Sequence, residues 1–302
     1  MSIAAVEARE ASFESAGGGL WGEAWVRLRR NPGAIAGFVI VTAIVVMAIF
    51  APLIAPYGPR DQNLDLIKGG CCPGPSAEHL FGVDQLGRDE FSRIVYGARY
   101  SLIIGVVSVS VAFIVGSILG AIAGFVGGAV DSVIMRITDI WLTIPGFLMA
   151  IGIVAILGPG LWQIMVAIGI INVPLFTRLL RGSVLAQREN DFVLAARSVG
   201  VPRKQILGSH ILPNAISPVI VQGTLALATA IIDAAGLGFL GLGPQDPSTP
   251  EWGTMLTDTE RYLQTAPHLA LIPGAAIVVT AISINLIGDG LREALDPKLR
   301  SR

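Results

Sequence analysis

The chain has 302 residues, of which 53% are hydrophobic and only 14% are charged. A soluble domain has about a quarter of its residues charged, so this composition, with a mean hydropathy of +0.68, excludes an ordinary soluble protein. The net charge of −1 says nothing about partners, and we expect no nucleic-acid binding.

Long apolar runs predict an all-α integral membrane protein. A membrane-spanning helix needs about 20 apolar residues, and unbroken runs differ from the weak alternating segments of a β-barrel. The run 140–177 is too long for one helix, and Gly158-Pro159-Gly160 divides it into a helical hairpin. We therefore predict six transmembrane helices, at residues 34–56, 99–125, 133–157, 161–180, 216–240 and 268–288.

The distribution of charge predicts the orientation of these helices. With a cytoplasmic N-terminus, 15 of the 21 Lys and Arg residues fall on the cytoplasmic side. The positive-inside rule therefore places both termini and the polar loop 178–214 in the cytoplasm. Residues 1–33 are predicted to form a cytoplasmic tail, in which Leu20 to Leu28 form an interfacial helix before the N-cap Asn31-Pro32. Residues 34–302 form the transmembrane domain.

Two polar segments are predicted on the outer side. Residues 57–97 are long for a connection and should form a folded outer lobe, and residues 243–267 form an outer loop in which Trp252 and Tyr262 suit a membrane interface. Cys71 and Cys72 are adjacent, about 3.8 Å apart at Cα, which is below the usual disulfide range. We favour two exposed thiols or a loop staple over a strained vicinal disulfide.

The second span has glycines at every fourth position, namely Gly116, Gly120, Gly124 and Gly128. Such spacing is typical of close helix packing in membranes. No pattern supports catalysis by this chain. Gly236 to Gly241 match a dinucleotide fingerprint but end a membrane span, no Walker A sequence occurs, and His79, His210 and His268 are far apart. We expect no enzyme activity, no cofactor and no metal site in this chain.

The polar loop 178–214 has the start and stop signals of two short helices. Asn190 is expected to cap the first, with Asp191 in its first turn, and Gly200 to end it. Pro202 starts the second helix and Pro213 ends it. One apolar face is predicted on each helix: Phe192, Ala195, Ala196 and Val199 on the first, and Ile206, Leu207 and Ile211 on the second. A docking helix and a helix resting on lipid are both compatible with this pattern.

Ionisable residues inside spans are candidates for function. Arg136 and Asp139, three residues apart, are expected to pair on one helix face, and Asp233 lies deepest. Asn285 and Asp289 lie at the inner end of the last span. These residues either line a transport pathway or form a polar clasp between helices. Outside, Arg88, Asp89, Arg93 and Arg99 either brace the outer lobe against a partner or form a solvated face.

The loop resembles the EAA loop of ABC-importer permeases in three features: Ala195-Ala196, Gly200, and His210 followed by Ile211-Leu212-Pro213. The family has Glu before the two alanines, whereas this chain has Leu194. Other segments resemble the second, C-type permease subunit of the dipeptide/oligopeptide branch. They are Phe81–Asp84 with Gly87–Asp89, Phe239–Gly243 with Trp252-Gly253, and Gly288–Arg292 with Leu295–Pro297.

This resemblance implies a type I importer permease in a bacterial-type inner or plasma membrane. It forms half of a pathway for short peptides, together with a homologous second permease subunit, two ATPase subunits or domains that bind ATP and Mg²⁺, and an external substrate-binding protein. The loop 181–215 would couple the chain to the ATPase through Asp191, Phe192, Ala195, Ala196, Val199, Gly200, Pro202, His210 and Pro213. Nickel, glutathione or another small cofactor are alternative solutes. An ion-coupled carrier without an ATPase is an alternative class.

Overall fold

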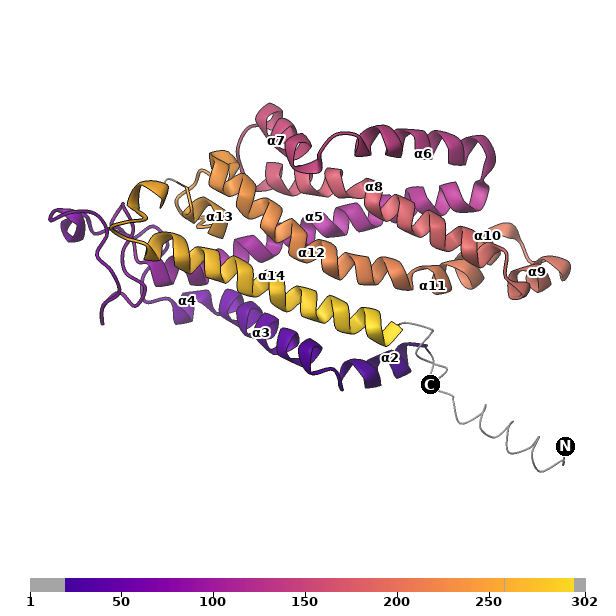
Figure 1. Ribbon diagram of the computed structural model, residues 1–302, viewed down its shortest axis with the longest axis horizontal. Coiled ribbons are helices and arrows are strands. Elements are labelled where there is room, and N and C mark those ends of the chain that lie inside the picture. The colour runs from indigo at the N-terminus through magenta and orange to yellow at the C-terminus, as the bar shows by residue number, and fades with distance from the viewer. Residues whose placement is uncertain (1–19, 258, 296–302) are drawn as a thin grey trace, which may run out of the picture.

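The computed structural model describes residues 20–257 and 259–295, and all its regular elements there are helices (Figure 1). Five helices are long and apolar enough to span a membrane. They are α3 (Pro32–Ile49), α5 (Glu90–Val126), α8 (Leu161–Arg188), α12 (Ser217–Leu237) with the π-turn η3 (Gly238–Leu242), and α14 (His268–Leu295). The predicted tail before residue 20 and the C-terminal residues 296–302 lie outside the described residues.

The third predicted span, 133–157, is not one straight helix. It is divided into α6 (Gly128–Leu142) and α7 (Gly146–Leu157), which are bent by 87° relative to each other. Pro145 stands at the break, and a proline pushes the residue before it out of the helical conformation. Both helices pack on α8 (Figure 1), so the predicted hairpin 133–180 contains a sharp bend inside its first arm.

The glycine pattern of the second span is confirmed as a packing seam between α5 and α8. A Cβ atom on Gly116 would lie 2.6 Å from Phe176 Cβ, and one on Gly120 would lie 2.5 Å from the Thr177 carbonyl oxygen. Gly124 is similarly close to Arg181. Gly128 starts α6 and has no neighbour within 4 Å, so it lies outside the seam. The seam brings the α5 and α8 backbones together over about two helical turns.

The helix predicted at Leu20 to Leu28 is present as α2 (Leu20–Leu28), and it packs on the end of α14. Ala24 and Leu28 are buried with Ala34 and Ala294. Asn31 caps α3 as predicted, because its Oδ1 accepts a hydrogen bond of 3.0 Å from the Ala34 backbone N–H. Its Nδ2 donates to Glu293 Oε2 at 2.7 Å, which ties the start of α3 to α14.

The short elements gather at the two ends of the bundle (Figure 1). At one end lie α4 (Ala51–Ile54), η1 (Leu64–Ile67), α13 (Trp252–Met255) and η4 (Thr259–Tyr262). At the other end lie α9 (Asp191–Ser198), α10 (Arg203–Gln205), the π-helix η2 (Ile206–Ile211) and α11 (Leu212–Ala215). The described start of the chain and the end of α14 lie towards α9 (Figure 1), as the predicted topology requires.

Candidate coupling site

The segment 190–213 follows directly on α8, whose last turns are held by ion pairs. Arg181 forms a two-point contact with Asp131 on α6, with Nη2 to Oδ2 at 2.7 Å, and Arg178 pairs with Asp139. The predicted pairing of Asp139 with Arg136 is therefore wrong, because Asp139 faces α8. Arg188 donates a hydrogen bond to the Gly124 carbonyl oxygen at 3.3 Å. Three of the six cations of the polar loop therefore contact neighbouring helices.

Helix α9 begins and ends as predicted, but Asn190 does not cap it with its side chain. Asn190 has the extended backbone of an N-cap residue, whereas its Nδ2 donates to Gln187 Oε1 at 2.9 Å. The amide thus fastens the start of α9 to the end of α8. The cap position is correct, and the predicted capping hydrogen bond is wrong.

The single apolar face predicted for α9 is divided between two sides of the helix. Val193 and Ala196 are 0% and 7% exposed and belong to the main core. Phe192 is 40% and Val199 79% exposed, and Ala195 is exposed between them. Ala196 is therefore an internal packing residue. We name the outward side, formed by Phe192, Ala195 and Val199, the coupling face.

Gly200 ends α9 as predicted. Its φ is +81°, a left-handed conformation that glycine adopts without strain, and the next N–H, of Val201, donates to the Ala196 carbonyl oxygen at 3.1 Å. Pro202 then precedes α10 in an extended conformation. Ile206 and Ile211 are buried, as expected for the inward side of this second helix.

Pro213 does not end that helix. It lies in the first turn of α11, where a missing N–H costs nothing, and the chain runs on through Ile216 into α12. His210 lies in the π-helix, with Nδ1 buried and without a hydrogen-bond partner. The Asn214 Nδ2 group donates to the His210 carbonyl oxygen at 2.8 Å. The segment is therefore joined to α8 at one end and to α12 at the other.

The remaining intramembrane candidates are not brought together. Within residues 20–257 and 259–295, the side chains of Asp233, Asn285 and Asp289 make no hydrogen bond or ion pair. Asp233 is partly buried on α12, Asn285 is partly buried on α14, and Asp289 is exposed one turn further. The expected clasp is therefore present only as the Asp139–Arg178 pair, and roles in a pathway stay predictions.

The outer charged residues form a buried network instead of a solvated face or a partner surface. Asp84 Oδ2 accepts a hydrogen bond of 2.6 Å from Arg88 Nε and lies 3.6 Å from Arg93 Nε. Asp89 caps α5 at the Ser92 N–H (2.7 Å) and contacts His79 Nδ1 at 2.9 Å. All these residues are buried. Arg99 donates to the Ala48 carbonyl oxygen, which joins α5 to α3.

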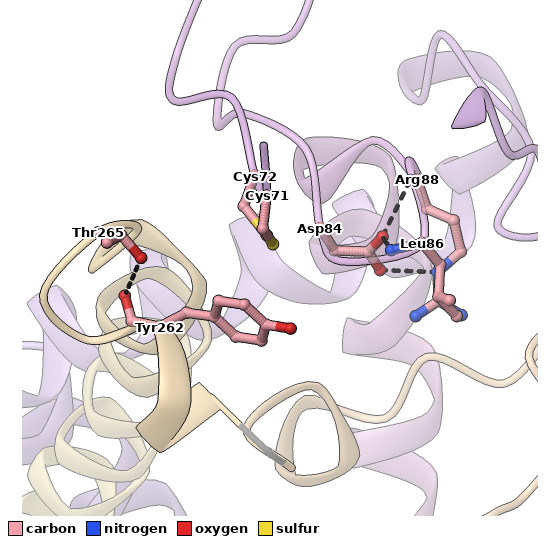
Figure 2. Close-up of a disulfide and its surroundings, with 7 residues drawn as sticks. All are labelled: Cys71, Cys72, Asp84, Leu86, Arg88, Tyr262 and Thr265. Carbon is pink, nitrogen blue, oxygen red and sulfur yellow. Dashed lines mark hydrogen bonds and ion pairs between the residues drawn. A yellow bond between two sulfur atoms is a disulfide. The ribbon is translucent and has the colours of Figure 1, made fainter. Parts of the chain in front are cut away.

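Cys71 and Cys72 are joined by a disulfide near this network (Figure 2). Cys72 is buried with Ala266 and Leu269, and Tyr262 packs against this cluster. Two exposed thiols are therefore not what the structure shows. Figure 2 also shows that Asp84 accepts hydrogen bonds from the backbone N–H groups of Leu86 and Arg88.

The outer loop is anchored by Trp252 and Glu251. Trp252 is 1% exposed, and its Nε1 donates to the Ile94 carbonyl oxygen at 3.0 Å, so its expected membrane-interface position is wrong. Glu251 accepts hydrogen bonds from the backbone N–H groups of Gly253 (2.8 Å) and Thr254 (2.9 Å) and from Ser101 (3.3 Å). Burial raises the pKa of Glu251 to about 7. Gly97 permits the close approach of the outer loop to α5, because a Cβ there would lie 2.3 Å from the Pro250 carbonyl oxygen.

A bundle of membrane-spanning helices that displays a short helix between two of them is the architecture of a multi-pass membrane protein. The chain belongs to the family of binding-protein-dependent transport system inner membrane components, whose model matches residues 116–301. Residues 19–68 match the N-terminal transmembrane domain of oligopeptide transport permease C. The chain is thus a multi-pass inner-membrane permease of the ABC-importer class, of the C type.

Relatives with assigned names cover nearly the whole chain. A dipeptide transport system permease protein, DppC, of Alkalihalophilus pseudofirmus is 50% identical over 93% of this chain and 91% of its own length. A di/tripeptide permease of Pseudomonas aeruginosa and a glutathione permease of Escherichia coli are each 45% identical, over 92% and 93% of this chain and 92% and 91% of their own lengths.

An inward-facing methionine ABC transporter has the same fold, with a TM-score of 0.54 over 68% of this chain and 96% of that chain, at 20% identity. The ABC-importer family contradicts the alternative of an ion-coupled carrier.

Proposed function

We propose that the chain forms half of a translocation pathway for short peptides, in a complex with a homologous second permease, two ATPase subunits or domains and an external binding protein. The choice of short peptides as the solute is supported by the 50% identity to a dipeptide permease over 93% of the chain. Glutathione, itself a short peptide, is the second candidate, because a glutathione permease is 45% identical over a similar length.

The coupling face supports the proposed contact with the ATPase. Phe192 and Val199 expose apolar surface that no element within residues 20–257 and 259–295 covers. A partner that seats on this face would remove that surface from water, which stabilises the complex. ATP and Mg²⁺ would be bound and hydrolysed in the partner subunits, and the chain itself supplies only the docking surface.

The elements around the segment suggest how a displacement of α9 reaches the membrane. Asn190 fastens α9 to α8, the glycine seam joins α8 to α5, and the Arg181–Asp131 pair joins α8 to α6. ATP binding that favours the closed ATPase pair would shift the equilibrium between two arrangements of these helices. In this proposal both termini and the segment 190–213 face the cytoplasm.

The solute is tested with the complete complex, reconstituted from the four kinds of subunit in lipid vesicles. We expect uptake and ATP hydrolysis to be stimulated by di- and tripeptides in the presence of the binding protein. Equal or greater stimulation by glutathione identifies that solute instead, and stimulation only by a nickel ion contradicts a peptide importer. A complex without the binding protein is the control for unstimulated hydrolysis.

The candidate pathway residue Asp233 can be tested in the same vesicles. We propose that its carboxylate contacts the solute path, because it is ionisable, partly buried and without a partner among the described residues. Asp233→Asn keeps the shape and removes the charge. Normal uptake by a fully assembled Asp233→Asn complex would show that the charge has no transport role.

A further inference from the structure

An open cavity of about 670 Å³ lies between the end of α5, the end of α8 and the segment that follows α9. Three arginines line it, together with four apolar residues: Arg188, Arg197, Arg203, Phe125, Val126, Val201 and Ile206. No carboxylate is part of this lining. The cavity therefore presents three guanidinium groups, against an apolar wall, to an anion.

The hydrogen-bonding capacity of these arginines is largely unused. Arg188 Nη1 donates to the carbonyl oxygens of Gly124 (3.3 Å) and Phe125 (3.5 Å), while its Nε is buried without a hydrogen-bond acceptor. The exposed Glu189 carboxylate lies 3.6 Å from that Nε. Arg197 and Arg203 form no ion pair or hydrogen bond with their side chains within the described ranges. An acceptor with several oxygens would satisfy all three groups.

The cavity does not belong to the coupling face. Successive residues of an α-helix are about 100° apart, so Arg197 points about 160° away from both Ala195 and Val199. A partner seated on the coupling face would leave the cavity on the far side of α9. The cavity instead opens beside Val126, the last residue of the apolar helix α5, which is 61% exposed.

A separate, apolar groove lies beside α5, before the residues that line the cavity. Ile118 and Ala121 of α5 line this groove with Leu212 and Ile216, and Ala121 lies one helical turn before Phe125. Ile118, Ile122 and Val126 are exposed at every fourth position and continue the apolar surface up to the cavity. The apolar groove lies next to a basic cavity, at the point where the apolar length of a spanning helix ends. This combination complements a phospholipid, which has an anionic phosphate and apolar acyl chains.

We propose that the cavity binds the phosphate of an anionic phospholipid, with an acyl chain in the groove along α5. Arg197 and Arg203 belong to the loop that carries the coupling face, and Arg188 belongs to α8. The bound lipid would therefore bridge the coupling segment to the membrane helices. This site lies outside the coupling face.

The test uses the full chain, purified in detergent and examined by native mass spectrometry. Phosphatidylglycerol, phosphatidylcholine and inorganic phosphate are added in separate titrations. We expect a one-to-one adduct with phosphatidylglycerol at concentrations at which phosphatidylcholine gives none. Arg197→Gln/Arg203→Gln should raise the phosphatidylglycerol concentration needed for the adduct about 30-fold, the loss expected for two basic side chains. The exposed Arg292→Gln on α14 is the matched control and should bind normally.

Two further variants keep the result interpretable. Arg197→Lys/Arg203→Lys keeps both charges and should retain most of the binding even if the glutamine variant folds poorly. Ile118 lines the groove and does not line the basic cavity. Ile118→Asn should therefore weaken the binding of phosphatidylglycerol but not the binding of inorganic phosphate.

The proposal is overturned if the glutamine variant retains phosphatidylglycerol like the wild type. It is equally overturned if inorganic phosphate displaces the lipid and Ile118→Asn has no effect, because the site then binds free phosphate. Retention of lipid by the glutamine variant together with loss of the ATPase from the complex would assign the arginines to a protein interface.

Discussion

The outer region and the coupling segment lie at opposite ends of the same bundle and are built in opposite ways. In the outer region, formed by residues 57–97 and 243–267, one cluster of charged groups is buried and paired, as Asp84 is with Arg88. In the coupling segment 190–213, Phe192 and Val199 expose apolar surface, and Arg197 and Arg203 have no partner in the described part of the chain.

This difference indicates what each end requires. Buried ion pairs that are fully hydrogen-bonded fix one arrangement, and removal of one partner leaves an uncompensated charge. The ion pairs of Asp84 are therefore completed by residues of the outer region itself. The coupling segment keeps its binding capacity free, so its stability and its function are separable by mutation. Four predictions test this contrast, ordered from the largest expected effect.

Asp84→Asn should destabilise the outer region most. The amide keeps the size of the side chain but places a donor against Arg88 and Arg93, so two buried guanidinium groups lose their anion. We expect a loss of about 3–5 kcal/mol in the free energy of unfolding, measured by thermal unfolding in detergent. Asp65→Asn, whose exposed partner is Lys68 in the same lobe, should leave the melting temperature unchanged. A similar response in both variants would contradict the difference between buried and exposed pairs.

Glu251 should make the stability of the outer loop depend on pH. Because burial raises its folded pKa from 4.5 to about 7, the folded protein keeps a proton that the unfolded chain releases between these values. The contribution of Glu251 to the free energy of unfolding should therefore fall by a few kcal/mol as pH rises from 4.5 to 7.

Melting temperatures of wild type and Glu251→Gln between pH 4.5 and 8 measure this effect. The glutamine variant should have a smaller slope between pH 4.5 and 7 than the wild type, whereas the exposed Glu78→Gln in the outer lobe should keep the wild-type slope. An unchanged slope in Glu251→Gln would assign the pH dependence to another group.

The two adjacent alanines of α9 should respond differently to the same substitution. Ala195→Trp adds a bulky group to the coupling face, and we expect at least tenfold weaker retention of the ATPase during co-purification with little change in melting temperature. Ala196→Trp enters the core, where Ala196 is 7% exposed, and should lower the melting temperature. Full retention of the ATPase by Ala195→Trp would contradict the coupling face.

Gly200→Ala should have the smallest effect. A Cβ at a φ of +81° costs about 1–2 kcal/mol, although space is open around it. We expect a small loss of melting temperature and a few-fold weaker retention of the ATPase, because the end of α9 must shift. Gly208→Ala is the matched control, since Gly208 also has open space but no positive φ. Equal effects in the two variants would show that the turn at Gly200 is not required.

The sequence predicts the parts of this fold that depend on composition and on local signals. Apolar length located the spanning helices, and Gly200 and Asn31 marked a helix end and a helix start correctly. These features depend on neighbouring residues and on the membrane, so a single sequence contains them.

The predictions that were wrong depend on which side of a helix faces the bundle. Phe192, Val193, Ala195, Ala196 and Val199 are all apolar or small, so periodicity alone could not decide that Val193 and Ala196 face inward. Asp139 had two arginine neighbours in the fold, and its pairing with Arg178 depends on the approach of α6 to α8. The burial of Trp252 similarly requires Gly97 on α5, a contact that no local pattern reports.

The length of α5 has a mechanical consequence. Its 37 residues extend for about 55 Å, against a hydrocarbon core of about 30 Å, so one unbroken helix joins the outer network at Asp89 to the turn at Gly127. A rod of this length acts as a lever. A tilt of about 10° around its midpoint displaces each end by about 5 Å, in opposite directions. Small rotations of this helix about its midpoint are thereby converted into large, opposed movements at the two ends of the bundle.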